Sequence, residues 1–193
     1  SLNGTLIDGT TCTGSVTIPD GVTSIAGGAF DSCTGLTAIA IPKSVTSIGD
    51  SAFYRCTSLT EITIPDSVTS MGDYVFDGCT GLTKVTMPDS ITSISDYAFR
   101  SCTGLTEVTI PDSVTSIGDY AFRDSTGLTK IVIPDSVTSI GDSAFDNCDN
   151  LIIYGHTGSF AETYAKEHGI QFAAYTFGDL DNSGKVDSTD IFY

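Results

Sequence analysis

The sequence predicts a repeat solenoid, rich in β-structure with short helical turns, made of about six 23-residue coils and closed by a C-terminal capping helix. Two spacings indicate this architecture: successive prolines lie 23 residues apart, and phenylalanines keep the same interval from Phe30 to Phe145. The abundant Thr, Ser, Ile, Asp and Gly suit short strands joined by turns. The prolines are Pro19, Pro42, Pro65, Pro88, Pro111 and Pro134.

The strands of one coil can be read from LTEVTIPDSVTSIGDYAFRDSTG, which begins at Leu105. Val108 and Ile110 alternate as the inward face of a strand does. Pro111 ends that strand because it has no amide proton to donate to a ladder. Val114 and Ile117 supply a second inward pair.

The remainder of the coil is expected to turn the chain. Asp119 follows a glycine and is placed to cap a short helical turn that carries Ala121 and Phe122. A single coil cannot bury these side chains alone, so neighbouring coils must stack with parallel strands in register.

The repeated unit I-x-I-P-x-S-V-T-S-I-G-x-x-A-F-x-x-C-T-x-L resembles the BspA-type leucine-rich repeat of bacterial surface proteins, over residues 16–151. Residues 4–19 resemble the irregular first coil of that family, and residues 153–172 resemble its usual ending. Within that ending, Ser159-x-x-Glu162 is a capping box and Gly169 a helix stop, which predicts a capping helix over 160–168. We therefore expect one solenoid domain over residues 1–176.

The net charge and the hydropathy of the sequence argue against some classes of binding partner. The net charge is −16 and the eight basic residues are scattered, which argues against nucleic acid and anionic membrane surfaces as partners. No apolar run approaches the roughly 18 residues of a membrane span. The chain begins at Ser1 without a signal peptide, so we expect that any leader was removed or lies outside this sequence.

The cysteines form a further column. Because in-register side chains point parallel to one another and a ladder offers no unique pairing, we expect buried, reduced thiols that act as small hydrophobes. Ser125 fills one position of this column, and Cys12 lies outside the register. The column contains Cys33, Cys56, Cys79, Cys102 and Cys148.

Charged residues also stack from coil to coil. Glu61, Lys84, Glu107 and Lys130 alternate in sign, which predicts favourable cross-strand pairs. Two aspartate columns stack like charges; turn and cap duties account for them, and bound cations are the alternative. The columns are Asp50, Asp73, Asp96, Asp119 and Asp142, and Asp66, Asp89, Asp112 and Asp135.

The candidate ligand surface is a column of three tyrosines, Tyr74, Tyr97 and Tyr120, with Arg100 and Arg123 nearby. We expect this column to face outward. Its composition is that of an interface hot spot, and the rings could also stack on sugars. The alternative is that the aromatic column only stabilises neighbouring coils.

No motif supports catalysis. His156 and His168 fall in the predicted cap, away from any nucleophile or carboxylate pair, and no phosphate loop or nucleophile elbow is present. The sequence therefore predicts a protein that is not an enzyme.

The C-terminal tail breaks the repeat with D-L-D-N-S-G-K-V-D-S-T-D, which follows the spacing of an EF-hand calcium loop. Oxygen ligands at this spacing converge on one calcium ion, and Gly184 permits the sharp turn. The expected ligands are Asp179, Asp181, Ser183, the carbonyl of Lys185, Asp187 and Asp190.

Residues 177–193 resemble the first segment of a type I dockerin, the module that binds the cohesin modules of scaffold proteins. The resemblance implies that Ser188 and Thr189 contact cohesin. A dockerin normally has two such segments, so we expect weak calcium binding by this segment alone.

These features together predict a secreted, cell-surface-associated bacterial module. Its solenoid is expected to bind a protein or glycan ligand, and its dockerin to attach it to a cellulosome-like scaffold. The alternatives are a structural spacer or an accessory module of a larger secreted enzyme.

Overall fold

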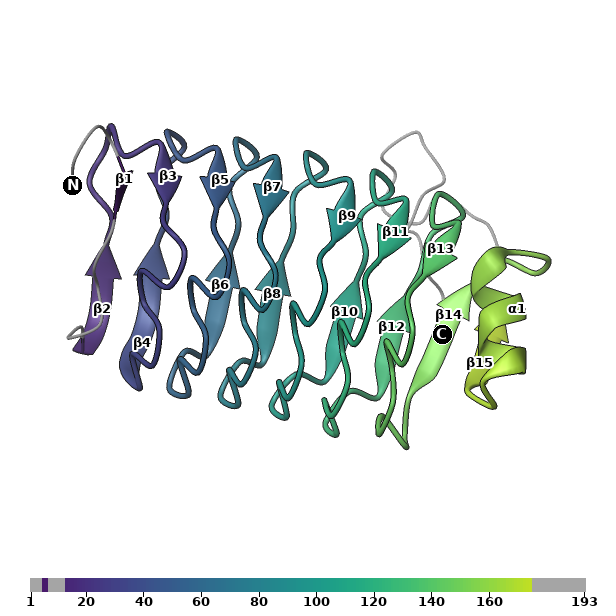
Figure 1. Cartoon of the computed structure of the whole chain (residues 1–193). Helices are drawn as coiled ribbons and strands as arrows, with labels where there is room; N and C mark the ends of the chain where they lie inside the picture. Colours follow the sequence, from purple (N-terminus) through teal and green to yellow (C-terminus); the bar gives the residue numbers. More distant parts are fainter. Residues whose placement is uncertain (1–4, 7–12, 175–193) are drawn as a thin grey trace, which may run out of the picture.

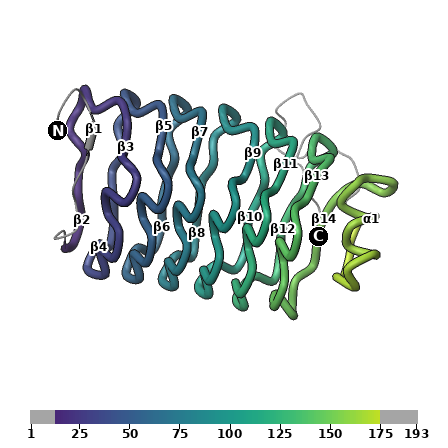
Figure 2. The backbone as a smooth tube through the Cα atoms, viewed as in Figure 1, coloured from purple at the N-terminus to yellow at the C-terminus, as the bar shows by residue number. Residues whose placement is uncertain are grey.

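The computed structural model describes residues 5–6 and 13–174, and it shows a solenoid of about seven coils stacked along one axis (Figures 1 and 2). The N-terminal coils lie at one end, and helix α1, Phe160–Glu167, lies at the other. The repeat solenoid predicted from the 23-residue interval is confirmed. No helix in the described part is long and apolar enough to span a membrane.

One wall of the solenoid consists of parallel strands only two residues long, because each coil contributes a single Ser-Ile or equivalent step. The backbone register follows the repeat, with Ser47 opposite Ser70 and Ile48 opposite Met71. These strands are β1 (Thr5–Leu6), β3 (Ser24–Ile25), β5 (Ser47–Ile48), β7 (Ser70–Met71), β9 (Ser93–Ile94), β11 (Ser116–Ile117) and β13 (Ser139–Ile140).

A second wall carries the longer strands, of which β2, β4, β6, β8, β10 and β12 each precede a proline. Each pairs in parallel with its neighbour within three sheet segments, β2-β4, β6-β8 and β10-β12-β14-β15. A register shift between Gly14 and Ser15 marks the first pair as irregular. The strands are β2 (Thr13–Thr17), β4 (Gly35–Ala40), β6 (Glu61–Thr63), β8 (Lys84–Thr86), β10 (Glu107–Thr109), β12 (Lys130–Val132), β14 (Ile152–Gly155) and β15 (Gln171–Ala174).

The third wall, here called the turn face, corrects the expectation of a short helical turn. The backbone enters the left-handed region at Tyr97 (φ 57°) and again at Ser101 (φ 56°), which a right-handed helix cannot include. Alternate amides instead donate to the next coil, as from Phe99 N to Ala121 O at 2.7 Å. The turn face is therefore a ladder of tight turns.

The predicted capping role of the aspartates also changes. The Asp96 carboxylate accepts a 2.8 Å hydrogen bond from the backbone amide of Asp119, its equivalent 23 residues later, and Asp119 does the same for Asp142. Asp50, Asp96 and Asp119 thus cap the following coil instead of their own turn. Gly118 is required beside this contact, because a Cβ there would collide with the side chain and backbone of Asp96.

The core is a column of stacked phenylalanines. Their ring centroids lie 5.2–5.4 Å apart from Phe30 to Phe145, and all are nearly or fully buried. Tyr164 of α1 continues the column with an edge-on contact of 6.0 Å to Phe145. Ser159 accepts from the Glu162 amide, and Gly169 adopts φ +67°, so the predicted capping helix is confirmed.

The cysteine column is buried, but it is not apolar. Each thiol donates to the carbonyl oxygen of the phenylalanine 26 residues earlier, as from Cys79 Sγ to Phe53 O at 3.0 Å. Ser125 makes the equivalent bond to Phe99 O at 2.7 Å and also accepts from the Cys102 amide. Burial raises the pKa of Cys56 to about 12, so this thiol stays protonated and able to donate.

One member of the column departs from the prediction of reduced thiols. Cys33 is disulfide-bonded, whereas Cys56, Cys79, Cys102 and Cys148 are free. The partner of Cys33 therefore lies outside the described residues. Parallel side chains prevent disulfides between cysteines of the same column. This constraint does not apply to a cysteine that lies outside the 23-residue register.

We predict that Ser125→Ala destabilises the fold by about 1–2 kcal/mol. It removes the buried hydrogen bonds of Ser125 with the Phe99 carbonyl and the Cys102 amide, which then keep only their 3.3 Å bond to each other. Cys79→Ser is expected to change stability by less than about 1 kcal/mol, since a hydroxyl can reach the same carbonyl. Urea unfolding of both variants measures the difference. A larger loss for Cys79→Ser than for Ser125→Ala would contradict the hydrogen-bonded ladder.

Candidate functional site

The three tyrosines of the candidate surface come together on the turn face. Tyr74 and Tyr97 stack with centroids 4.4 Å apart, and Tyr97 and Tyr120 with centroids 4.8 Å apart. All three are half-buried and have left-handed backbones, with φ between 56° and 58°. Ser51 and Ser143, which bracket them in the column, share this conformation. The backbone of the coil therefore fixes the position of the side chain in this column, whether the residue is Tyr or Ser.

Stacking decides which part of each ring a ligand can reach. Both faces of Tyr97 are covered, by Tyr74 on one side and Tyr120 on the other. Ring edges and hydroxyls remain for outside contacts. Desolvation and the neighbouring Tyr74 raise the pKa of Tyr97, so its hydroxyl is protonated at neutral pH.

Arginines border the tyrosine column. The Arg100 guanidinium lies 5.2 Å from the Tyr97 ring centroid, and that of Arg123 lies 5.3 Å from the Tyr120 centroid. Both distances fit cation–π contacts. Arg55 makes a similar contact of 4.9 Å with Tyr54, which the sequence analysis did not select. We call Tyr74, Tyr97, Tyr120, Arg100 and Arg123 the tyrosine–arginine patch.

A buried ion pair anchors the patch. The Asp77 side chain is 3 % exposed; its Oδ1 accepts from Arg100 Nε at 3.1 Å and its Oδ2 lies 2.7 Å from Arg100 Nη2. Burial raises the pKa of Asp77, and Arg100 opposes that rise. The sequence analysis missed Asp77, although its offset of 23 residues from Arg100 was the signal that could have found it.

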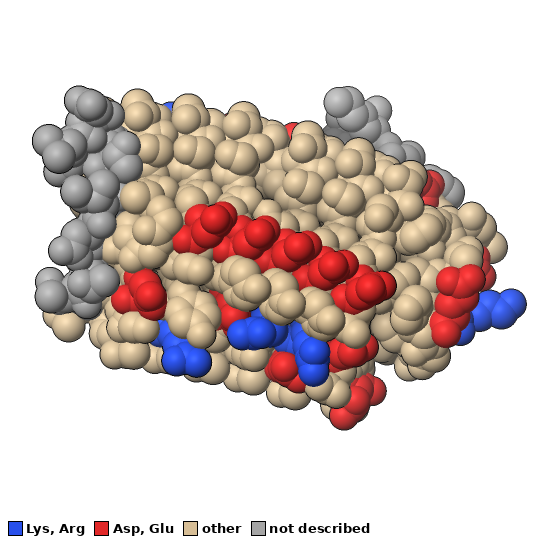
Figure 3. Space-filling model, in the orientation of Figure 1, with Lys and Arg blue, Asp and Glu red and all other residues tan. Residues whose placement is uncertain are grey.

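Acidic side chains flank the patch. Figure 3 shows an acidic row that crosses the coils, with basic side chains along one side of it. Desolvation raises the pKa of Asp73, and the like charges of Asp96 and Asp50 add to the effect. Within the described ranges, no three His, Cys, Asp or Glu side chains come together as a metal site.

Two other charged contacts bear on the sequence predictions. Lys130 Nζ lies 2.6 Å from Glu107 Oε1 across paired strands, which confirms the expected cross-strand pair. The sequence analysis did not foresee a second contact, in which His156 Nδ1 lies 2.6 Å from Asp135 Oδ2, a single carboxylate. The last coil brings these residues together across 21 positions of sequence.

The predicted calcium loop and cohesin contacts lie outside the described residues. This applies to every residue of that prediction: Asp179, Asp181, Ser183, Lys185, Asp187, Asp190, Ser188 and Thr189.

Stacked parallel coils, a ladder of tight turns and a half-buried aromatic column define a leucine-rich-repeat protein of the solenoid class. Residues 8–126 match the family model for the BspA type leucine rich repeat region, in six copies. This match spans more than half of the chain, and the chain belongs to the BspA-type leucine-rich-repeat family. Among curated proteins, none matches it.

Solved structures agree with this assignment. The leucine-rich repeat protein TpLRR of T. pallidum is 29 % identical, with a TM-score of 0.71, over 82 % of this chain and 85 % of that protein. A leucine-rich repeat protein from Eubacterium ventriosum is also 29 % identical, with a TM-score of 0.61, over 76 % of this chain and 46 % of that one.

A third protein, from Bacteroides ovatus, is 26 % identical with a TM-score of 0.52, over 86 % of this chain and 52 % of its own. This chain therefore spans about half the length of the Eubacterium and Bacteroides proteins. The shared coils establish the fold of the repeat region.

We predict that Arg100→Ala lowers the free energy of unfolding by about 2–3 kcal/mol at neutral pH, because it leaves the buried Asp77 carboxylate unpaired. The native pKa of Asp77 is already raised and should rise further without Arg100. The associated stability is therefore present below the unfolded pKa, near 4, and is lost as pH rises through the native value.

The difference between Arg100→Ala and the wild type should consequently shrink as the pH falls toward 4, which denaturant melts at several pH values would show. Arg123→Ala is the matched control, since its nearest carboxylate, Asp124, is 42 % exposed and 3.6 Å away. That change should cost less than about 1 kcal/mol at any pH. Equal, pH-independent losses in the two variants would contradict the assigned pair.

Proposed function

We propose that this chain is a non-catalytic binding module whose protein ligand contacts the tyrosine–arginine patch. Tyrosine and arginine are the residue types enriched in interface hot spots. Here three adjacent coils present the tyrosines as one rigid column, so little side-chain entropy remains to be lost on binding. This preformed aromatic column is the observation that carries the proposal.

The geometry favours a protein ligand over a glycan. A sugar stacks on the face of an aromatic ring, and the column covers both faces of its central ring. Phenolic hydroxyls and guanidinium edges remain accessible, and these groups hydrogen-bond well to backbone carbonyls and polar side chains. A glycan would have only the outer faces of Tyr74 and Tyr120.

Backbone conformation adds support for a role beyond folding. A left-handed conformation costs roughly 1–2 kcal/mol for a residue with a side chain, and Gly or Asn adopts it more readily than Tyr. Ser51 and Ser143 show that small residues also fit this column. Three tyrosines in succession at such positions are consistent with selection for a surface.

The test is replacement of Tyr74, Tyr97 and Tyr120 together by Ser, with binding measured against arrays of purified extracellular-matrix proteins and of glycans. We expect the variant to stay folded, because two coils already carry Ser here, while losing about 0.5–1.5 kcal/mol of stability for each stacked pair. Binding to a matrix protein recognised by the wild type should fall at least tenfold.

The matched control changes Thr63, Thr86 and Thr109 to Ala on the second wall, and it should bind as the wild type does. Unchanged binding by the tyrosine variant would locate the ligand elsewhere, with the Glu61–Lys130 column next to be tested. Binding to glycans alone would contradict a protein ligand. If substitutions on none of the three walls reduce ligand binding, the chain is better explained as a spacer or as an accessory module of a secreted enzyme.

We also propose that the module acts outside the cell and is attached to a scaffold through residues 177–193. The disulfide at Cys33 supports an oxidising compartment, because such bonds persist mainly in exported proteins. The attachment rests on the spacing of Asp179, Asp181 and Asp187, which suits a calcium loop of dockerin type, with cohesin as the partner.

We predict that the 193-residue chain binds one calcium ion, and binds it weakly, because a single loop lacks the partner segment that rigidifies a complete dockerin. Calorimetry would measure this binding. Asp181→Ala should abolish it, whereas Asp135→Ala, a change of equal charge in the repeats, should leave it intact. Calcium binding that survives Asp181→Ala and Asp190→Ala together would show that the ion sits elsewhere.

A further inference from the structure

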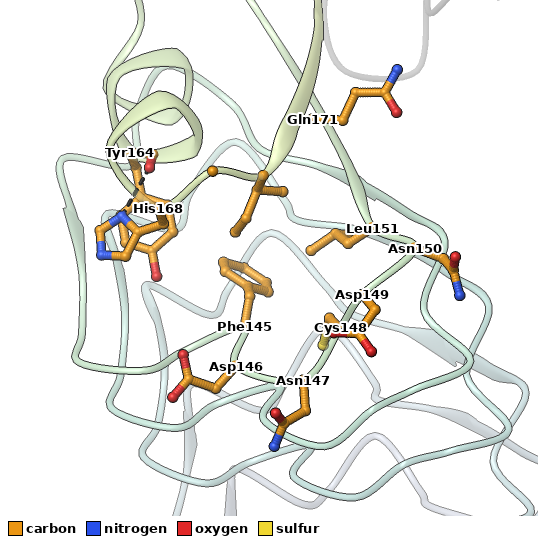
Figure 4. Close-up of a pocket in the computed structure, with 12 residues that line it drawn as sticks. Phe145, Asp146, Asn147, Cys148, Asp149, Asn150, Leu151, Tyr164, His168 and Gln171 are labelled. Atoms are coloured by element: carbon orange, nitrogen blue, oxygen red, sulfur yellow. Dashed lines mark hydrogen bonds between the residues drawn. The ribbon is translucent and has the colours of Figure 1, made fainter.

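A cavity separates the last coil from the capping helix. Its volume is about 410 Å³, and it lies between the 145–151 segment, the end of α1 and the start of β15 (Figure 4). Phe145 and Tyr164 supply aromatic surface, and His168 lies beside Tyr164. No lysine or arginine is among the described residues that line it.

Tyr164 is the key residue of this cavity. Its side chain is nearly buried, at 5 % exposure, and its ring packs edge-on against Phe145 and stacks at 3.9 Å on His168. Within the described part of the chain, the Tyr164 hydroxyl makes no hydrogen bond to a protein group, and its oxygen is open to solvent through the cavity. Figure 4 shows that the hydroxyl points along the cavity toward Asp146. A nearly buried phenol therefore offers an unused oxygen to an occupant.

The charge around the cavity is negative. Asp146 and Asp149 line it and are exposed to solvent. Burial raises the pKa of Tyr164 to about 12, and the charges of Asp146 and Asp142 contribute. The hydroxyl is thus neutral, and the field around it favours a cation.

We propose that this cavity binds an alkylammonium group, with the ammonium between Asp146 and the Tyr164 hydroxyl and the alkyl chain against the Phe145 and Tyr164 rings, while Asp149 adds negative charge at the rim. Carboxylates supply the countercharge, the phenol oxygen accepts one ammonium hydrogen, and an aromatic surface suits both a cation and its methylenes. A lysine side chain and a free diamine share this chemistry.

Other ligand classes fit less well. An anion would meet two carboxylates, and none of the described lining residues is a lysine or arginine that could offset them. A purely apolar ligand would leave the Tyr164 hydroxyl buried without a partner, which is costly. A metal ion would need three convergent ligands, and the described residues provide no such group.

The test titrates the whole chain, labelled with ¹⁵N, with two probes: cadaverine and the blocked tripeptide acetyl-Gly-Lys-Gly-amide. We expect saturable shifts of amides in residues 145–151 and 164–171, with dissociation constants of about a millimolar. The same peptide with an acetylated lysine should bind at least tenfold more weakly, because acetylation removes the charge.

Variants separate this site from general attraction to an acidic protein. Tyr164→Phe should weaken binding about threefold or more while leaving the thermal midpoint unchanged, because the lost hydroxyl has no partner in the fold. Asp146→Asn with Asp149→Asn should weaken binding about tenfold. The matched control, Asp66→Asn with Asp89→Asn, removes the same charge from distant turns and should change affinity less than twofold.

Tighter binding of the peptide would identify a lysine of a partner polypeptide as the source, and tighter binding of cadaverine a free amine. The proposal is overturned if neither probe gives saturable shifts, if acetyl-lysine binds as well as lysine, or if the control pair weakens binding as much as the cavity pair. These outcomes do not depend on the tyrosine–arginine patch, which lies on the turn face of other coils.

Discussion

Hydrogen bonding between successive coils is the interaction on which the rest of this structure depends. A coil satisfies much of its backbone through its neighbours: Gly118 donates to Ile94 of the preceding coil, and Phe99 to Ala121 of the following one. These bonds form only if equivalent residues lie opposite one another, so every coil must keep the same length. The 23-residue period, the columns and the rigidity of the turn face all follow from that requirement.

The same constraint explains why polar residues recur at buried positions. The repeated backbone places the same carbonyl group in each coil. Either a thiol or a hydroxyl can donate a hydrogen bond to that carbonyl, as Cys79 and Ser125 show. Asp50, Asp96 and Asp119 likewise accept a hydrogen bond from an amide of the next coil, and these fixed donors offset part of the repulsion in the column of like charges. Because the coils repeat, these hydrogen bonds form continuous ladders along the solenoid.

Residues that differ from the repeat consensus give parts of the surface a chemistry that the other coils lack. Tyr occupies three positions between Ser51 and Ser143 in their column, and a buried Asp77 pairs with Arg100 at the equivalent place of the next coil. At the C-terminal end, the Phe column finishes on Tyr164, whose hydroxyl has no equivalent in the phenylalanines. Both candidate binding regions therefore arise from substitutions that the coil geometry permits but does not require.

The sequence by itself determined the period, the buried positions and the capping helix, because in-register stacking makes each of them visible as spacing. Leu105, Ile110 and Phe122 could be placed in the core from periodicity alone, and Ser159 and Gly169 bounded the helix through local backbone chemistry. Only the tertiary structure decided what lies between coils or beyond the repeat.

The left-handed turns of the turn face, the contact of His156 with Asp135 and the cavity beside Tyr164 depend on how separate segments meet. Spacing cannot show the direction of a backbone hydrogen bond, and so the aspartates were expected to cap their own coil. Nor can it show that stacked tyrosines cover one another's faces, because that depends on the distance and tilt between rings in three dimensions.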